Sequence, residues 1–169
     1  MSEFQRLIDV RQAEGKVAKL EASETERAAL ATRFDLVAVK RLEAELVLSR
    51  KDRVVSASGT LSADIVQSCA ISDEDLPVTI RENVAFRFVP EAAHATPDEE
   101  VELSGDELDD IEYAGSHFDL GEAVAQSMAL AIDPFATGPN ADEARRRAGI
   151  SDETASGAFA ALAALKKQD

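Results

Sequence analysis

Carboxylates are the most numerous groups in this sequence that could do acid–base or metal chemistry, and they gather in one stretch. Residues 88–144 hold fifteen Asp and Glu residues and no Lys or Arg. Acid–base catalysis needs such groups in a water-poor pocket that shifts their pKa values, which a long run of acids does not provide. An alternative is a calcium or magnesium site built from four of these acids, Asp106, Asp109, Asp110 and Glu112. Their spacing is not that of an EF-hand loop, so we expect no metal here.

The sequence also lacks the sulfur and nitrogen ligands of a zinc site. Cys69 is the only cysteine, and His94 and His117 stand 23 residues apart, so no zinc-ligand spacing occurs. Three acidic residues at 73–75 are expected to raise the pKa of Cys69 and to disfavour its thiolate. Glycine-rich phosphate loops and the GxSxG and HExxH motifs are missing as well. We predict a protein without a cofactor, without zinc and without enzymatic activity, in which Cys69 is structural.

The concentrated negative charge gives the acidic residues a second interpretation. The net charge is −15, and the eighteen acidic residues outside 88–144 balance all eighteen basic ones. A stretch of one sign is either a solvated loop or a docking surface that attracts basic partners and repels phosphates. The candidate partner-binding acids are Asp98, Glu99, Glu100, Glu102, Asp106, Glu107, Asp109 and Asp110. Three apolar residues at helical spacing near the C-terminus, Phe159, Leu162 and Leu165, are candidate anchors for the same partner.

Binding to nucleic acid would need basic clusters, because cationic side chains release counterions from phosphates. The sequence has only small clusters, and the candidate RNA contacts are Arg50, Lys51, Arg53, Arg145, Arg146 and Arg147. Each cluster also fits a solvated turn or a helix end. With a pI of about 4.5, the chain is expected to be a poor general RNA binder.

Alternating hydrophobicity predicts the sheet that must position these groups. Apolar residues recur at every second position in three runs, which predicts strands over 42–48, 54–66 and 78–89 in an antiparallel meander or partly closed barrel. An apolar run after Asp119 predicts a helix over 120–132 that is apolar on nearly all sides and therefore packs against the sheet, or against the sheet and a partner together. The expected fold class is α+β.

The segments before and after this sheet complete the predicted organisation. Short extended segments are expected on both sides of Gly15, and Ser23 with Glu26 forms a capping box that begins a helix ending near Phe34. The N-terminal residues are too charged for a signal peptide, and no run is long enough to span a membrane, so we expect a cytoplasmic protein without membrane contact.

Three parts of the chain are expected. Residues 1–135 form the α+β domain, which includes an acidic loop over 91–112. Residues 136–156 form a polar linker, with a short helix between Asn140 and Gly149. Residues 157–169 form a short C-terminal docking helix, which is too short to be stable alone.

Three stretches together resemble the bacterial YceD family, the large ribosomal RNA subunit accumulation proteins. They are GTLSADIVQSCAISDEDLPVTI at 59–80, FDLGEAVAQSMALAIDPF at 118–135, and the tail from Phe159 to Lys166. The resemblance implies a role in making or stabilising large-subunit ribosomal RNA. Many relatives have Cys-x-x-Cys where this chain has Cys69 and Ser72, and one thiolate cannot hold a structural zinc ion.

Two hypotheses follow from these observations. In the first, the chain is a non-enzymatic assembly factor that binds a ribosomal protein or a ribosomal precursor particle, with direct contact to ribosomal RNA as an open alternative. In the second, it is a metal-dependent hydrolase that acts on RNA through its acidic residues. The lack of clustered ligands and of a histidine pair favours the first hypothesis.

Overall fold

The structure of the 169-residue chain is a computed structural model and describes residues 2–91 and 110–149. The described residues form two compact units. Unit 1 comprises residues 2–66, 77–91 and 110–132, and unit 2 comprises residues 67–76 and 133–149. The predicted residues Phe159, Leu162 and Leu165 lie outside the described residues, as does most of the predicted acidic loop.

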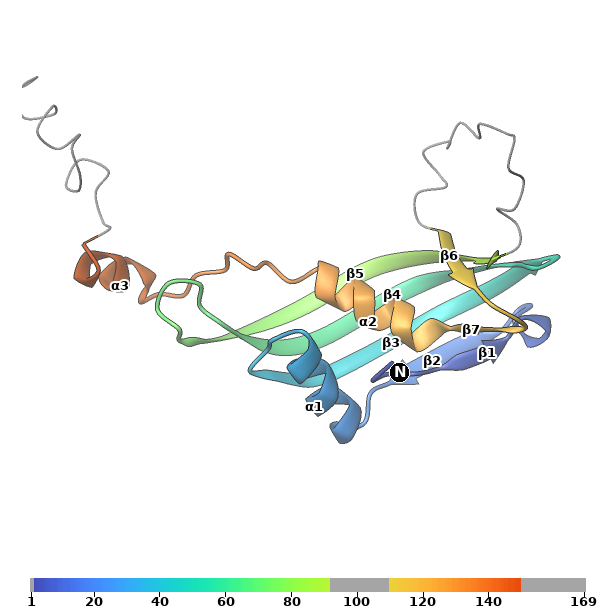
Figure 1. Cartoon of the computed structure of the whole chain (residues 1–169), viewed down its shortest axis with the longest axis horizontal. Helices are drawn as coiled ribbons and strands as arrows, with labels where there is room; N and C mark the ends of the chain where they lie inside the picture. Colours follow the sequence, from blue (N-terminus) through green and yellow to red (C-terminus); the bar gives the residue numbers. More distant parts are fainter. Residues whose placement is uncertain (1, 92–109, 150–169) are drawn as a thin grey trace, which may run out of the picture. The chain divides into compact units, whose positions relative to one another are not determined.

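Unit 1 is built on a mainly antiparallel sheet of five strands, as the alternating pattern predicts. The strands lie in the order β2-β3-β4-β5-β6, and within the described residues the sheet is open rather than closed into a barrel (Figure 1). Their bounds are β2 Val17–Glu21, β3 Ala38–Lys51, β4 Val54–Ser68, β5 Asp75–Pro90 and β6 Asp110–Tyr113. A second sheet pairs β1 Leu7–Asp9 with β7 His117–Asp119. The predicted α+β class is confirmed.

The long strands bury one face because their apolar residues alternate. On β3, Leu42, Ala44, Leu46 and Leu48 are all buried, and the residues between them are more exposed. The turn to β4 gives an antiparallel ladder that runs from the pair Lys51 and Val54 to the pair Ala38 and Val66, with one irregularity. Gly59 is required in this ladder, because a Cβ there would lie 2.0 Å from the carbonyl oxygen of Glu45. The two strands therefore approach more closely than side chains would allow.

Helix α1, Glu24–Arg33, begins at the predicted capping box. The Ser23 hydroxyl accepts a hydrogen bond from the backbone N–H of Glu26, and the Glu26 carboxylate accepts one from the backbone N–H of Ser23. The two side chains thereby satisfy N–H groups that the first turn leaves without partners.

Helix α2, Leu120–Leu130, packs against one face of the sheet (Figure 1). Val124 and Met128 are fully buried, which confirms the predicted packing. The helix is not buried on all sides, however, since Gln126 is exposed and the side chain of Leu130 is 87 % exposed. The sequence left open whether the sheet alone or a partner as well covers this apolar helix, and the side with Gln126 and Leu130 is not covered by any described residues.

The end of the predicted acidic loop is a strand. Residues 110–113 form β6, which pairs in parallel with Arg87–Pro90 at the end of β5. This pairing brings together residues more than 20 positions apart, and neither β6 nor β7 is long enough to show alternation. The prediction of a loop extending to residue 112 was therefore wrong at its C-terminal end.

Candidate functional site

Of the eight candidate partner-binding acids, the structure describes only Asp110, in β6. Its carboxylate accepts hydrogen bonds of 2.9 and 2.8 Å from the Arg87 guanidinium, and its side chain is 13 % exposed. The charge of Asp110 is thus already compensated within the chain. The other seven candidate acids lie outside the described residues; they are Asp98, Glu99, Glu100, Glu102, Asp106, Glu107 and Asp109.

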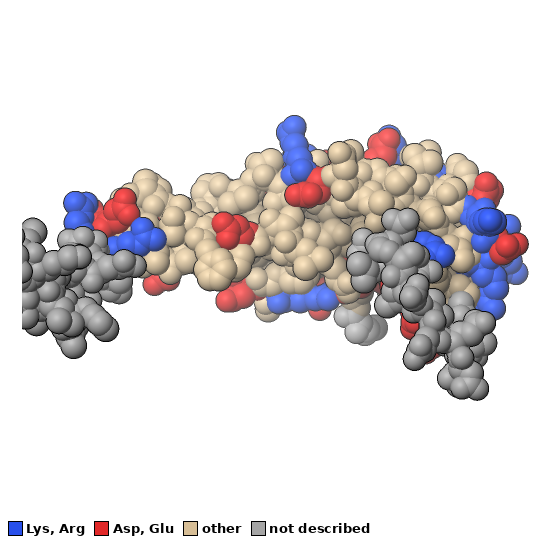
Figure 2. All heavy atoms as spheres, turned by 90° about the horizontal axis from the view of Figure 1, so that it is seen from above, with Lys and Arg blue, Asp and Glu red and all other residues tan. Residues whose placement is uncertain are grey.

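The first basic cluster lies at one end of unit 1, where the β3–β4 hairpin turns. Arg50, Lys51 and Arg53 stand at this turn, and within the described chain none of their side chains has an ion-pair partner. Lys16 is brought to the same end, because its carbonyl accepts a 2.8 Å hydrogen bond from the backbone N–H of Leu48. Figure 2 shows Lys and Arg side chains, with Asp and Glu side chains among them, at this end of unit 1. Sequence reasoning missed Lys16, which only strand pairing places there.

The second basic cluster lies on a short helix of unit 2, α3, which spans Ala141–Arg147. Arg145 pairs with Asp142 at 3.0 Å, and Arg147 pairs with Glu143 one turn earlier. Arg146 is exposed. Two of the three arginines therefore have carboxylate partners on their own helix, which leaves this cluster with less free positive charge than the hairpin end.

The Asp-Leu-Gly-Glu sequence at the start of α2 has a structural explanation. The Asp119 carboxylate accepts hydrogen bonds from the backbone N–H of Glu122 at 3.1 Å and from that of Arg6 at 2.8 Å, so it caps the helix and holds the N-terminal segment. Gly121 lies against the same segment, and a Cβ there would be 2.0 Å from the carbonyl oxygen of Phe4. Leu120 is fully buried. Asp119, Leu120 and Gly121 thus each make contacts that stabilise the fold.

Glu122 is the centre of an ion-pair cluster that joins both helices to the N-terminal segment. Its carboxylate accepts hydrogen bonds of 2.6 and 2.9 Å from Arg33 and one of 2.6 Å from the Ser2 hydroxyl. Arg33 also pairs with Glu3 at 2.7 Å. The hydrogen bonds from Arg33 lower the pKa of Glu122 to about 2. A carboxyl group that stays ionised so far below neutral pH is unsuited to general acid–base catalysis at pH 7.

Cys69 lies in unit 2, where the turn between β4 and β5 meets the chain after α2. Its Sγ accepts hydrogen bonds from the backbone N–H of Ser72 at 3.4 Å and from that of Gly138 at 3.3 Å. The nearby Ser72 hydroxyl, followed by the backbone N–H groups of Gly138 and Ser72, lowers the pKa of Cys69 to about 7. The predicted rise in this pKa was therefore wrong. The thiol is nevertheless almost fully buried, with 1 % exposure.

Neither a metal centre nor a spanning helix is found in the parts of the chain that the structure describes. Across residues 2–91 and 110–149, no group of three His, Cys, Asp or Glu side chains comes close enough together to hold a metal ion. Over the same residues, the helices are too short or too polar to cross a bilayer. Among the described residues, the hairpin end, helix α3 and the exposed side of α2 are candidate surfaces for function.

Comparison with protein families gives one match. The model of the family described as large ribosomal RNA subunit accumulation protein YceD matches residues 57–166, which is more than half of the chain. Searches of curated proteins and of solved structures return no match. The matched range contains most of β4 and all of β5, α2 and α3, together with the Cys69 turn and the Asp-Leu-Gly-Glu motif. The chain therefore belongs to the YceD family of large ribosomal RNA subunit accumulation proteins.

Proposed function

We propose that this chain supports the accumulation of large-subunit ribosomal RNA as a non-enzymatic assembly factor in the cytoplasm. In this proposal it binds a basic ribosomal protein or a ribosomal precursor particle. Family membership supports the connection to large-subunit RNA. The observation that carries the binding mechanism is the charge distribution, with fifteen carboxylates and no Lys or Arg over residues 88–144.

A negative field of this kind speeds the encounter with a cationic protein and opposes the approach of RNA. Ribosomal proteins that wait for their RNA site carry exposed positive charge, which binds other RNA without specificity. A bound acidic factor would screen that charge until the correct particle is available. The large-subunit RNA would then accumulate, because its ribosomal proteins reach it without first binding other RNA.

The test neutralises the acidic candidates together. Asn or Gln replaces each of the eight candidate acids, which are Asp98, Glu99, Glu100, Glu102, Asp106, Glu107, Asp109 and Asp110. Association of the parent and the neutralised chain with purified large-subunit precursor particles is then measured at low and at physiological salt. The parent chain should bind more weakly at physiological salt, because exposed charges are screened over a Debye length of about 8 Å. The neutralised chain should bind weakly at both. Unchanged or stronger binding at both salts would contradict the role of the acidic stretch.

The same association experiment also tests whether the chain contacts RNA directly. Arg50, Lys51 and Arg53 are the best candidates, because they share one end of unit 1 and lack ion-pair partners within the described chain. Their triple alanine variant should leave association unchanged if the partner is a basic protein. A matched control replaces three exposed cations that are not candidate RNA contacts, Lys19, Lys40 and Arg81. Loss of binding in the hairpin variant alone would assign the interface to RNA phosphates.

A further inference from the structure

Within the part of the chain that the structure describes, strand β5 has an open edge over most of its length. In the sheet order it lies between β4 and β6, but β6 pairs only with Arg87–Pro90. Among the described residues, no strand covers the β6 side of β5 from Pro77 to Phe86. An open edge presents unpaired backbone N–H and C=O groups at alternate residues, and it is a template for another strand. The parallel pairing of β6 shows that this edge accepts a strand at its end.

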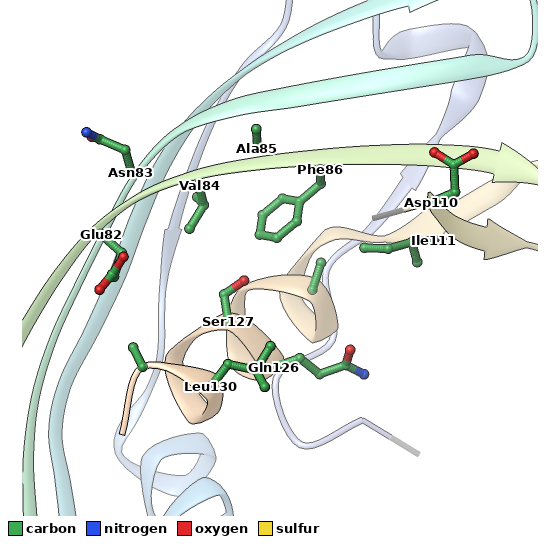
Figure 3. Close-up of a pocket in the computed structure, with 12 residues that line it drawn as sticks. Glu82, Asn83, Val84, Ala85, Phe86, Asp110, Ile111, Gln126, Ser127 and Leu130 are labelled. Carbon is green, nitrogen blue, oxygen red and sulfur yellow. The ribbon is translucent and has the colours of Figure 1, made fainter. Parts of the chain in front are cut away.

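A groove of about 640 Å³ lies between helix α2 and residues 82–86 of β5. Val84 and Phe86 point from β5 towards α2, and Ser127 points from α2 towards β5 (Figure 3). Val84 and Phe86 are only half-buried, and Leu130 on the helix is 87 % exposed. The groove therefore has unpaired backbone groups on one side and apolar side chains on the other. In strand addition the backbone groups hydrogen-bond the added strand, and the side chains select its residues.

The charge of the groove is negative. Its lining includes two carboxylates, Glu82 and Asp110, and no Lys or Arg. Asp110 is paired with Arg87, whereas Glu82 is exposed and has no ion-pair partner within the described residues. Glu82, Val84 and Phe86 stand at alternate positions and so face the same side of the strand. A strand added here would place a cation opposite Glu82 and apolar residues opposite the other two.

We propose that the open edge of β5 binds an extended segment of a basic partner protein, in which one Lys or Arg and two apolar residues stand at successive alternate positions and so share one face. Charge decides against a second copy of this chain, because two molecules of charge −15 repel each other. Nucleic acid is disfavoured by the same carboxylates. The inference rests on the proposed function and deepens it, since it identifies how a basic protein is recognised.

Synthetic peptides test the inference on the full chain. The probe, called the Val–Lys peptide, is a short capped peptide with one Lys and two Val at successive alternate positions and Thr between them, and its binding is measured by fluorescence anisotropy. Amide hydrogen exchange over residues 77–86 reports where it binds. A Val–Glu peptide and a Val–Lys peptide with N-methylated amides on one edge are the controls, because the first reverses the charge and the second cannot extend a sheet. Each control should bind at least about tenfold more weakly.

Two pairs of protein variants locate the site. Leu130→Lys and Glu82→Lys should each weaken binding of the Val–Lys peptide by about tenfold or more, because they remove an apolar wall residue or reverse the groove charge. Val47→Lys and Glu21→Lys change exposed residues on β3 and β2 in the same way and should leave affinity within about twofold. Absence of binding, equal binding of the N-methylated peptide, or equal effects of all four variants would overturn the proposal.

The remaining outcomes separate this inference from the proposed function. If precursor particles bind the chain but neither the Val–Lys peptide nor Leu130→Lys affects that association, strand addition is refuted and the assembly role stands. If the peptide binds at β5 while particles do not associate, the assembly role is refuted and the strand-binding edge stands. If the free chain forms a dimer that Leu130→Lys abolishes, the edge binds a second copy and the proposed occupant is wrong.

Discussion

Replacing Glu122 by Gln should destabilise the protein at neutral pH and have little effect in acid. The ordinary pKa of this carboxyl is 4.5, and Arg33 lowers it to about 2. Each pKa unit corresponds to about 1.4 kcal/mol, so ionisation of Glu122 contributes about 3 kcal/mol before solvent screening. The side chain retains 23 % exposure, and screening reduces this contribution to about 2 kcal/mol. Gln has the same shape but no charge, so the substitution removes mainly this contribution.

The sign of the pH dependence follows from the lowered pKa. A carboxyl whose pKa is lower in the folded state contributes stability that is present above pH 4.5 and is lost as the pH falls towards 2. Urea unfolding of the parent chain and of Glu122→Gln, measured from pH 7 to about pH 3, should therefore give a difference of about 2 kcal/mol at neutral pH. This difference should shrink steadily below pH 4.5.

A control separates this cluster from an ordinary surface pair. Glu45 pairs with Lys19 at 3.0 Å, but the two side chains are 57 % and 75 % exposed. Glu45→Gln should therefore change the free energy of unfolding by no more than about 0.5 kcal/mol at any pH. The reasoning is refuted if Glu122→Gln costs the same at pH 7 and at low pH, or if it costs no more than Glu45→Gln.

Two further predictions concern residues inside the family match. Gly121→Ala should lower the free energy of unfolding by about 2 kcal/mol or more, because its Cβ would lie 2.0 Å from the backbone of Phe4. Ser127→Ala in the same helix should change it by less than about 0.5 kcal/mol, and equal effects in urea unfolding would count against the close approach. The thiol of Cys69 should titrate near pH 7 when followed by thiolate absorbance. Ser72→Ala should move that midpoint upward, and an unmoved midpoint would show that the Ser72 hydroxyl does not stabilise the thiolate.

The fold could be predicted where the signal is local. Alternation along β3, β4 and β5 identifies strands because one face of each is buried, and the Ser23 and Glu26 pair identifies a helix start within four residues. The strands β6 and β7 could not be found in this way. Each is at most four residues long and is defined by pairing with a distant segment. Which side of α2 stays exposed could not be predicted, because an apolar sequence does not say which face of the helix packs against the sheet.

The candidate site illustrates the same limit. The acidic residues next to Cys69 in sequence suggested a raised pKa, but the groups that hydrogen-bond its sulfur include a backbone N–H at Gly138, 69 positions away. The groove beside β5 has no sequence motif at all, since it arises from a strand edge left open and a helix placed next to it. The charge asymmetry, in contrast, is fully readable from the sequence.

The central claim is that this chain acts by binding a basic protein or particle rather than RNA alone. The most direct test captures purified large-subunit precursor particles on the immobilised full chain, before and after ribonuclease treatment. The account predicts that particles are captured, that basic ribosomal protein stays bound after the RNA is digested, and that raised salt releases it. Failure to capture particles, or capture that is lost on digestion and is reproduced by protein-free ribosomal RNA, would contradict it.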